Sequence, residues 1–178
     1  MVSKQEALWV LRAQTGDREA LELLLRSVQP ALHRYIRRLI GPLHADDVTQ
    51  EVLLTVYRKL WWLTSADLFR AWMFRIASRT AFRLLKKERR WPDHRRADEE
   101  LDTLAAPGPA PERETVQELL KDLEVTPACR AVLLLHFEEE MPLQEVAAVL
   151  EIPLGTVKSR LAYGLAAIRR HPNFRRSQ

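Results

Sequence analysis

The chain has 178 residues, of which 47% are apolar and 29% are charged, and its formal net charge is +4. This composition supplies enough apolar side chains for a packed core and excludes the low hydrophobicity of a disordered chain. No apolar run is long enough to span a membrane and charges interrupt the N-terminal residues, so we expect a cytoplasmic protein without membrane insertion. Cys129 is the single cysteine, which excludes an internal disulfide and a zinc site built on paired cysteines.

Positive and negative charges are segregated along the chain. Residues 69–96 contain ten Lys or Arg and two Asp or Glu, and residues 152–178 contain six Lys or Arg and no Asp or Glu. Residues 112–151, between these blocks, contain three basic and ten acidic side chains. Clustered Lys and Arg favour nucleic acid, because binding releases the counterions of the phosphates. The two basic blocks therefore predict two surfaces for a polyanion, and an anionic membrane is the weaker alternative.

Apolar residues recur at helical spacing and no segment alternates as a half-buried strand does, so we expect an all-α protein. A first helix should end at Gly16, and Asp17 should cap a second helix that Pro30 bends or restarts. The next helix should end before residue 42, and a further helix should cover residues 46–60. A longer helix should follow over residues 68–90.

Residues 92–111 combine Pro, Gly and acidic side chains without an apolar period, which is typical of a linker. The linker separates a domain over residues 1–91 from a domain over residues 112–178. We therefore expect two small helical domains joined by an acidic, Pro-containing linker, the second a four-helix unit. Its helices are expected near residues 112–123, 127–138, 142–150 and 154–170.

The helix over residues 68–90 has an apolar face and a basic face. Arg75, Arg79, Arg83 and Lys87 recur every fourth residue, with Lys86 and Arg90 beside them. Four of these cations, Arg75, Arg79, Arg83 and Lys86, are the candidate DNA contacts, and we call them the basic ribbon. Like charges at this spacing repel, and a polyanionic partner would offset that repulsion, whereas the alternative is a merely solvated basic face. Phe74, Phe82 and Trp91 near the ribbon could stack on unpaired bases, although such rings are more often core. The side chains expected to pack inward are Phe69, Trp72, Met73, Ile76, Ala77, Thr80 and Leu84.

Carboxylates open the helix over residues 46–60, where a helix N-terminus favours negative charge. Asp47 and Gln50 have the spacing of a capping box, and capping alone would explain why an aspartate stands at position 47. Together with Glu51 they could instead form a polar patch that docks a protein partner. Nothing nearby completes a metal or acid–base site around Asp46 and Asp47, so we expect no metal, no cofactor and no catalytic residue.

The segment 143–170 has the form of a helix-turn-helix. Its first helix would end before a turn at Ile152-Pro153, and its second helix would pack inward through apolar residues that include Val157 and Leu161. In this motif the second helix presents its N-terminal residues to base edges, while hydroxyls and cations hold phosphates. An ordinary helical hairpin is the alternative. The residues expected on the outer surface are Thr156, Lys158, Ser159, Arg160, Ala162 and Tyr163.

Together these segments resemble the extracytoplasmic-function (ECF) class of bacterial sigma factors, the dissociable promoter-recognition subunits of RNA polymerase in the sigma-70 family. The resemblance spans nearly the whole chain. ADDVTQEVLLTVYRKL resembles the polymerase-docking helix of the first sigma domain, and FRAWMFRIASRTAFRLLKKERR resembles its helix for the minus-10 promoter element. TPACRAVLLLHFEEEMPLQEVAAVLEIPLGTVKSRL resembles the second sigma domain, which reads the minus-35 element.

The resemblance implies a role for each group of candidate residues. Asp47, Gln50 and Glu51 would engage the coiled-coil clamp helices of the polymerase large subunit. The basic ribbon, with the loop around Trp61 and Trp62, would hold the melted non-template strand of the minus-10 element. The acidic run of the linker would mimic a nucleic-acid backbone near the RNA exit path. Core polymerase would supply the catalysis, so the chain need not be an enzyme.

The chain departs from the family pattern at three places. Arg79 stands where the family typically has Asn, and Arg only donates hydrogen bonds whereas Asn also accepts them, so we expect an altered base preference. Arg83 stands where the family often has an acidic or polar residue. Ala162-Tyr163-Gly164 stands where the family usually has an aromatic residue or His and then Arg, so we expect fewer phosphate contacts. The residues implied to enter the major groove at minus-35 are Thr156, Lys158, Ser159, Arg160 and Tyr163.

The leading interpretation is a sigma factor that binds core RNA polymerase and promoter DNA and directs promoter recognition, melting and transcription initiation. A sigma-like decoy that binds an anti-sigma factor is the first alternative, because of the three departures. A stand-alone helix-turn-helix DNA-binding regulator is the second, but it leaves the docking segment without a role. An anti-sigma factor is a further partner that the resemblance allows.

Overall fold

The computed structural model describes residues 3–88, 116–118, 120 and 123–170. The regular structure of these residues is helical, with no strand among them, so the all-α prediction is confirmed. The chain forms two compact units, Met1–Leu84 and Leu85–Gln178. The predicted linker at residues 92–111 and most of the predicted helix at residues 112–123 lie outside the described residues. The predicted domain limits remain a prediction.

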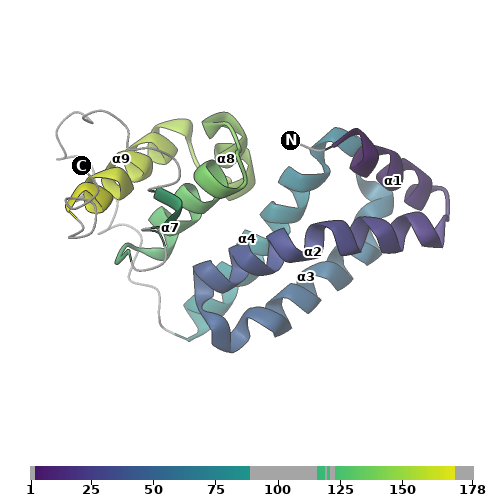
Figure 1. Cartoon of the computed structure of the whole chain (residues 1–178), viewed down its shortest axis with the longest axis horizontal. Helices are drawn as coiled ribbons and strands as arrows, with labels where there is room; N and C mark the ends of the chain where they lie inside the picture. The colour runs from purple at the N-terminus through teal and green to yellow at the C-terminus, as the bar shows by residue number, and fades with distance from the viewer. Residues whose placement is uncertain (1–2, 89–115, 119, 121–122, 171–178) are drawn as a thin grey trace. The chain divides into compact units, whose positions relative to one another are not determined.

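The first unit is built from α2 and the helices that pack on it. α2 contacts both α1 and α3, and Figure 1 shows it as a long helix beside them. In chain order the elements are α1 (Lys4–Gln14), α2 (Arg18–Ile40), η1 (Pro42–His44), α3 (Ala45–Lys59), η2 (Leu60–Trp62), η3 (Ala66–Leu68) and α4 (Phe69–Lys87). Fully buried side chains of the core include Val10, Leu24, Val28, Leu32, Ile36, Val52 and Val56.

α2 runs through Pro30 without interruption, so of the two expectations for this residue, a bend or a restart, the restart is wrong. Proline cannot donate to the carbonyl one turn earlier and costs a helix interior about 3 kcal/mol. Leu24, Val28 and Leu32 lie on one face of α2 on both sides of Pro30, and all three are fully buried. Their burial stabilises the helix by about 2 kcal/mol each, which outweighs the proline penalty.

In the first unit, α2 begins with a side-chain cap and α3 begins without one. Asp17 accepts a hydrogen bond from the Ala20 amide at 3.0 Å, which confirms the predicted cap of α2. α3 instead begins at Ala45, because η1 leads directly into it, and no side chain caps it. Asp47 therefore lies inside the first turn, and the predicted capping box with Gln50 is wrong. Both side chains are left exposed to solvent.

Two polar contacts tie α1 to the ends of the loop at residues 60–68. The side-chain amide of Gln14 donates to two carbonyl oxygens of the loop, at 2.9 Å and 2.8 Å. Arg70 lies just after the C-terminal end of the loop, in the first turn of α4. Its guanidinium donates to the carboxylate of Glu6 at 2.7 Å. Glu6 is buried, so this ion pair is shielded from water on the carboxylate side. The loop is therefore held at both ends by one helix.

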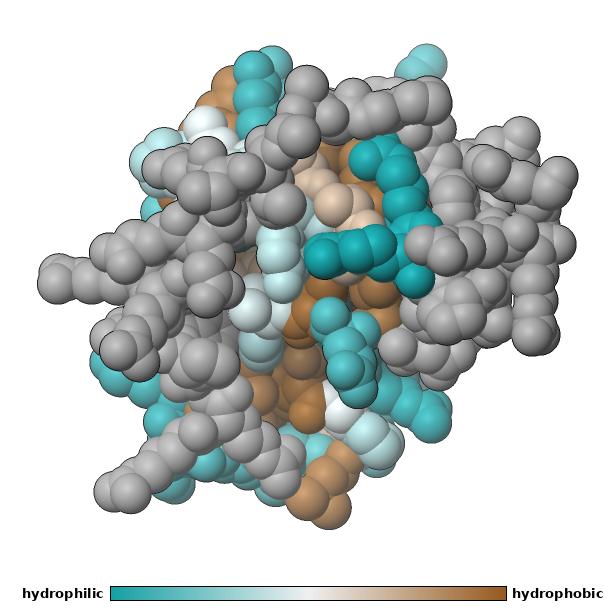
Figure 2. Space-filling model, turned by 90° about the vertical axis from the view of Figure 1, so that its left-hand side faces the viewer, coloured by the Kyte–Doolittle hydropathy of each residue, from teal (hydrophilic) through white to brown (hydrophobic). Residues whose placement is uncertain are grey.

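The described part of the second unit consists of helices packed on α9. α7 and α8 both contact α9, and Figure 1 shows the three together. On the face drawn in Figure 2, hydrophobic residues gather in the middle of the coloured area, with hydrophilic residues on either side. The predicted helices over 127–138, 142–150 and 154–170 are confirmed, although the first widens into a π-helical turn. The elements are α7 (Pro127–Leu133), the turn η5 (Leu134–Glu138), α8 (Leu143–Leu150) and α9 (Leu154–Arg170).

Glu6→Gln is expected to destabilise the first unit by about 2 kcal/mol at pH 7, because it leaves the Arg70 guanidinium without its charged partner. Burial raises the pKa of Glu6, but the hydrogen bonds from Arg70 and from the Ser3 amide outweigh burial, so the pKa lies below its ordinary value of 4.5. The ionised carboxylate therefore stabilises the fold above about pH 4.5, and this contribution is lost as the pH falls through the lower folded-state pKa. Chemical denaturation followed by tryptophan fluorescence measures the unfolding free energy at each pH.

Glu22→Gln is the matched control, because Glu22 belongs to an exposed pair with Arg26 on α2. Its unfolding free energy should differ from that of the unsubstituted protein by less than about 0.5 kcal/mol. Equal losses in the two variants, or a loss in Glu6→Gln that stays undiminished at pH 3, would rule out the buried pair as an anchor.

Candidate nucleic-acid interface

α4 buries a wider face than its apolar period predicts. Met73 is buried as expected, but Trp72 and Ile76 are only half-buried. Phe74 is fully buried instead, and its ring packs edge-on against Tyr35 with 5.2 Å between the ring centroids. Phe74 therefore belongs to the core and not to a base-stacking surface. Phe82 is half-buried, and Trp91 lies outside the described residues. Of the other residues expected to face inward, Phe69, Ala77 and Thr80 are buried and Leu84 is half-buried.

The basic ribbon of α4 is divided by its exposure. Arg79, Arg83 and Lys86 are exposed. Arg75 is half-buried, and its Nε atom is buried without a hydrogen-bond acceptor among the described residues. A buried donor that makes no hydrogen bond costs about 1–3 kcal/mol. Arg75 is thus less accessible to a phosphate than the other three cations of the ribbon.

The loop at residues 60–68 exposes two large aromatic rings. Trp61 is 48% exposed and Trp62 is 75% exposed, whereas Leu60 beside them is fully buried. Tryptophan is highly buried on average, so this exposure calls for a partner. Rings on the segment that leads into the basic helix α4 offer stacking platforms for unpaired bases. Both tryptophans are accessible, as their predicted role requires.

The predicted docking residues lie on an exposed stretch of α3. Asp47, Gln50 and Glu51 are all exposed, and the carboxylate of Glu51 accepts a hydrogen bond from the guanidinium of Arg83. The structure thus brings a predicted polymerase contact together with a predicted DNA contact from α4. Because both side chains are exposed, the pair contributes less than about 1 kcal/mol and opens readily.

Two apolar residues of α3 extend this surface and were not predicted from the sequence. Leu54 is 47% exposed and Tyr57 is 51% exposed. They follow Gln50 at steps of four and three residues, so all three share a face of the helix. Exposed apolar side chains on the same helix face as the predicted docking residues widen the surface that a partner could contact. The spacing from Gln50 was an available signal, but their apolar character made both residues resemble core positions.

The helix-turn-helix of the second unit turns at a strained residue. Glu151 ends α8 in the left-handed conformation, with φ 56° and ψ 43°. This conformation costs a residue other than glycine on the order of 1–2 kcal/mol. The amide of Ile152 donates to the carbonyl of Ala147 at 3.2 Å and closes the turn. Packing of α8 and α9 therefore holds the turn against its local preference.

α9 is rotated relative to the predicted orientation. Arg160, which was expected on the outer surface, is only 7% exposed, and Leu161, which was expected in the core, is half-buried. Lys158 is exposed as expected. The other predicted minus-35 residues, Thr156, Ser159 and Tyr163, are half-buried.

Close packing of α7 on α9 explains this rotation. A Cβ atom added to Gly164 would lie 2.7 Å from the side chain of Leu133, so glycine permits the two helices to approach this closely. Nearby, the thiol of Cys129 donates to the backbone carbonyl of Arg160 at 3.2 Å. Burial raises the pKa of this thiol to about 12, so it stays protonated near neutral pH. The α7–α9 contact thereby turns Arg160 inward and leaves Lys158 outside.

The described part of the chain offers no metal centre, because none of its His, Cys, Asp and Glu side chains form a group of three or more that could hold a metal ion. None of the helices that the structure describes is long and apolar enough to cross a membrane.

Gly164→Ala is expected to destabilise the second unit by about 1–2 kcal/mol, because the added methyl group overlaps the Leu133 side chain. The overlap outweighs the gain in helix propensity of about 1 kcal/mol. In the double variant with Leu133→Ala the overlap disappears, so its loss of stability should be smaller than the sum of the two single losses. The rate at which buried Cys129 reacts with a thiol reagent in denaturant reports unfolding of this unit. Strictly additive losses would show that the helices do not meet at Gly164.

Two family models match the chain, Sigma-70 region 2 over residues 24–91 and Sigma-70, region 4 over residues 124–170. The chain is 30% identical to the RNA polymerase sigma-H factor of Pseudomonas aeruginosa, over 94% of this chain and 94% of that protein. It is 26% identical to the ECF RNA polymerase sigma factor SigW of Bacillus subtilis, over 90% of this chain and 93% of that protein.

The fold is also similar to two solved structures. CnrH, solved in complex with the cytosolic domain of CnrY, matches with a TM-score of 0.65 and 24% identity, over 93% of this chain and 95% of that chain. The sigma factor RpoE in complex with the anti-sigma factor NepR from Bartonella quintana matches with a TM-score of 0.59 and 17% identity, over 83% of this chain and 93% of that chain. With an all-helical fold, both sigma regions in order and a relative matched along nearly its whole length, the chain belongs to the sigma-70 family, in its ECF class.

Proposed function

We propose that the protein binds core RNA polymerase and directs promoter recognition, melting and the initiation of transcription. The observation that carries this proposal is the pair of exposed tryptophans, Trp61 and Trp62, on the anchored loop that leads into the basic helix α4. An unpaired DNA strand needs rings on which its bases stack and cations that neutralise its phosphates. The two sigma regions matched in this chain support the same assignment.

Asp47, Gln50 and Glu51 are proposed to engage the clamp helices of the polymerase large subunit. Their exposure supports this role, and so does the exposed Leu54, which continues the same face of α3. Glu51 holds Arg83 in the free protein, so docking of Glu51 on the polymerase would release the Arg83 guanidinium for DNA. The exchange costs little, because an exposed ion pair contributes less than about 1 kcal/mol.

The exposed cations of the basic ribbon are proposed to neutralise the phosphates of the melted minus-10 strand, while Trp61 and Trp62 stack on its bases. Arg79 offers hydrogen-bond donors only, which favours a base that presents acceptors, such as guanine. Arg75 is assigned the smallest share of this contact, since its Nε atom is buried.

Lys158 is proposed to be the main DNA contact of α9 at the minus-35 element. It is exposed, whereas the hydroxyl of Ser159 already donates to the carbonyl of Thr156 at 3.1 Å. Arg160 is proposed to position the helix from inside the unit, since its side chain is buried. Tyr163 is half-buried and is assigned a contact at the edge of this surface.

We assign the protein a non-catalytic role in the cytoplasm, because the chemistry of RNA synthesis belongs to the polymerase. The proposed domains are residues 1–91 for docking and the minus-10 element and residues 112–178 for the minus-35 element, with residues 92–111 as the linker. The matched sigma regions fall within these two domains, which supports the division.

In vitro transcription with purified core polymerase on a promoter library tests the proposal. We expect discrete start sites that require both the protein and core polymerase. Stable core binding with no start site above the core-alone background would instead indicate a decoy for an anti-sigma factor. Promoter binding without any binding to core polymerase would indicate a stand-alone regulator.

On a promoter selected in this way, Lys158→Ala should weaken binding of the polymerase complex several-fold. The slope of log affinity against log salt should fall by about 0.9, as expected for the loss of one phosphate contact to duplex DNA. Lys4→Ala removes an exposed lysine of the first unit and is the charge control, for which we expect no change. A Lys158→Ala complex with unchanged affinity and slope would remove α9 as the helix that meets DNA.

A further inference from the structure

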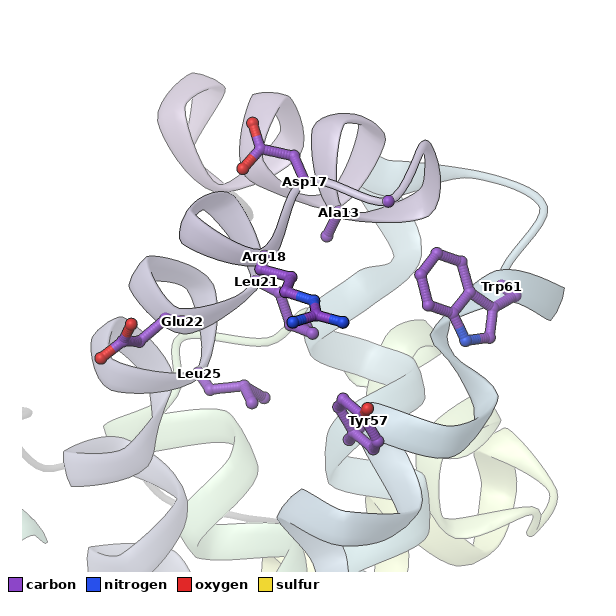
Figure 3. A pocket seen from close by; sticks show the side chains of 9 residues that line it. Ala13, Asp17, Arg18, Leu21, Glu22, Leu25, Tyr57 and Trp61 are labelled. Atoms are coloured by element: carbon purple, nitrogen blue, oxygen red, sulfur yellow. The ribbon is translucent and has the colours of Figure 1, made fainter.

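A cleft of about 760 Å³ opens in the first unit between the start of α2 and the end of α3 (Figure 3). Tyr57 and Trp61 line one side, and Leu21 and Leu25 of α2 line the other. Tyr57 belongs to α3 and Trp61 to the η2 turn that follows it, and both rings face the cleft (Figure 3). Each ring is about half exposed. An aromatic wall opposite an aliphatic wall suits a flat ring that is not stacked on its own neighbours.

The charges around the cleft leave it with a positive character. The carboxylate of Asp17 is paired with Arg12 at 2.6 Å, and that of Glu22 is paired with Arg26 at 2.5 Å. Figure 3 shows both carboxylates turned away from the two rings. Arg18 makes no ion pair with any residue that the structure describes, and its guanidinium reaches into the space between α2 and the rings (Figure 3). A cation in this position complements a phosphate group.

Trp61 belongs both to this cleft and to the loop that is proposed to hold the melted promoter strand. We propose, on the basis of that function, that the cleft is a second nucleotide subsite. An unpaired base of the melted strand lies between the Tyr57 and Trp61 rings and the two leucines, and Arg18 binds the adjacent phosphate. The cleft shares Trp61 with the loop, and Arg18 offers a cation to a phosphate. Both features favour a nucleotide over a protein segment, which would need a carboxylate of its own to pair with Arg18.

Leu21→Trp and Arg18→Ala test the subsite in the complex with core polymerase bound to fork DNA. The unpaired strand carries an abasic site at one position at a time. In the unsubstituted protein, the position that enters the cleft should weaken binding about fivefold or more when its base is missing. In Leu21→Trp the new ring stands between the two walls, where the base would lie, so the effect of that abasic position should disappear while the effects at other positions persist.

Arg18→Ala should weaken binding to every fork several-fold and lower the salt slope by about 0.7, as expected for one contact to a single strand. Arg37→Ala removes an exposed arginine of the same helix outside the cleft and should change neither quantity. Arg18→Ala leaves the apolar walls intact, so its salt slope decides the proposal even if Leu21→Trp does not fold.

An abasic profile of folded Leu21→Trp identical to that of the unsubstituted protein would overturn the proposal, as would an unchanged salt slope in Arg18→Ala. If both variants lost binding to core polymerase but kept their affinity for the single strand, the cleft would be a polymerase contact, and the proposal would also be overturned. Failure of the proposed function would look different, because the unsubstituted protein would then give no promoter-specific complex with core polymerase.

Discussion

Glu6 and Gln14, near opposite ends of α1, fix the two ends of the loop at residues 60–68. The ion pair between Glu6 and Arg70 ties the first turn of α4 to α1, and the amide of Gln14 satisfies two carbonyl groups of the loop. Between these anchors the loop exposes Trp61 and Trp62 to solvent, where they would otherwise tend to collapse onto the core. The proposed stacking surface, the neighbouring cleft and the direction of the basic helix all depend on this attachment.

In the second unit, the close packing of α7 on α9 decides which side chains of α9 are exposed. Gly164 lets α9 approach α7 until only a glycine fits against Leu133, and this approach sets the rotation of α9 about its axis. The rotation, rather than the charge of each residue, decides which cation faces outward. Lys158 is outside and Arg160 is inside, although the two are separated by a single residue.

Local signals in the sequence predicted the fold better than the site. Helical periodicity and the Asp17 cap predicted helices and their order, because both act within a few residues of the chain. Periodicity failed for Phe74 because the buried face of α4 is wider than a single apolar stripe. It failed for Arg160 because it counts apolar residue types, whereas a buried face also accepts the aliphatic stem of an arginine. The pairing of Glu51 with Arg83 joins residues that are 32 positions apart, which no local pattern encodes. The binding roles of the individual site residues remain predictions.

Promoter opening by the complex with core polymerase, read from a fluorescent 2-aminopurine base in the minus-10 strand, tests most directly whether α1 presents the loop to DNA. Gln14→Ala removes both hydrogen bonds from α1 to the loop and leaves the predicted docking residues and the basic ribbon intact. We predict that this variant binds core polymerase as the unsubstituted protein does but opens the minus-10 element several-fold less. Opening to the same extent and at the same rate, with hydrogen exchange showing that residues 60–68 have been released, would contradict the proposed role of α1.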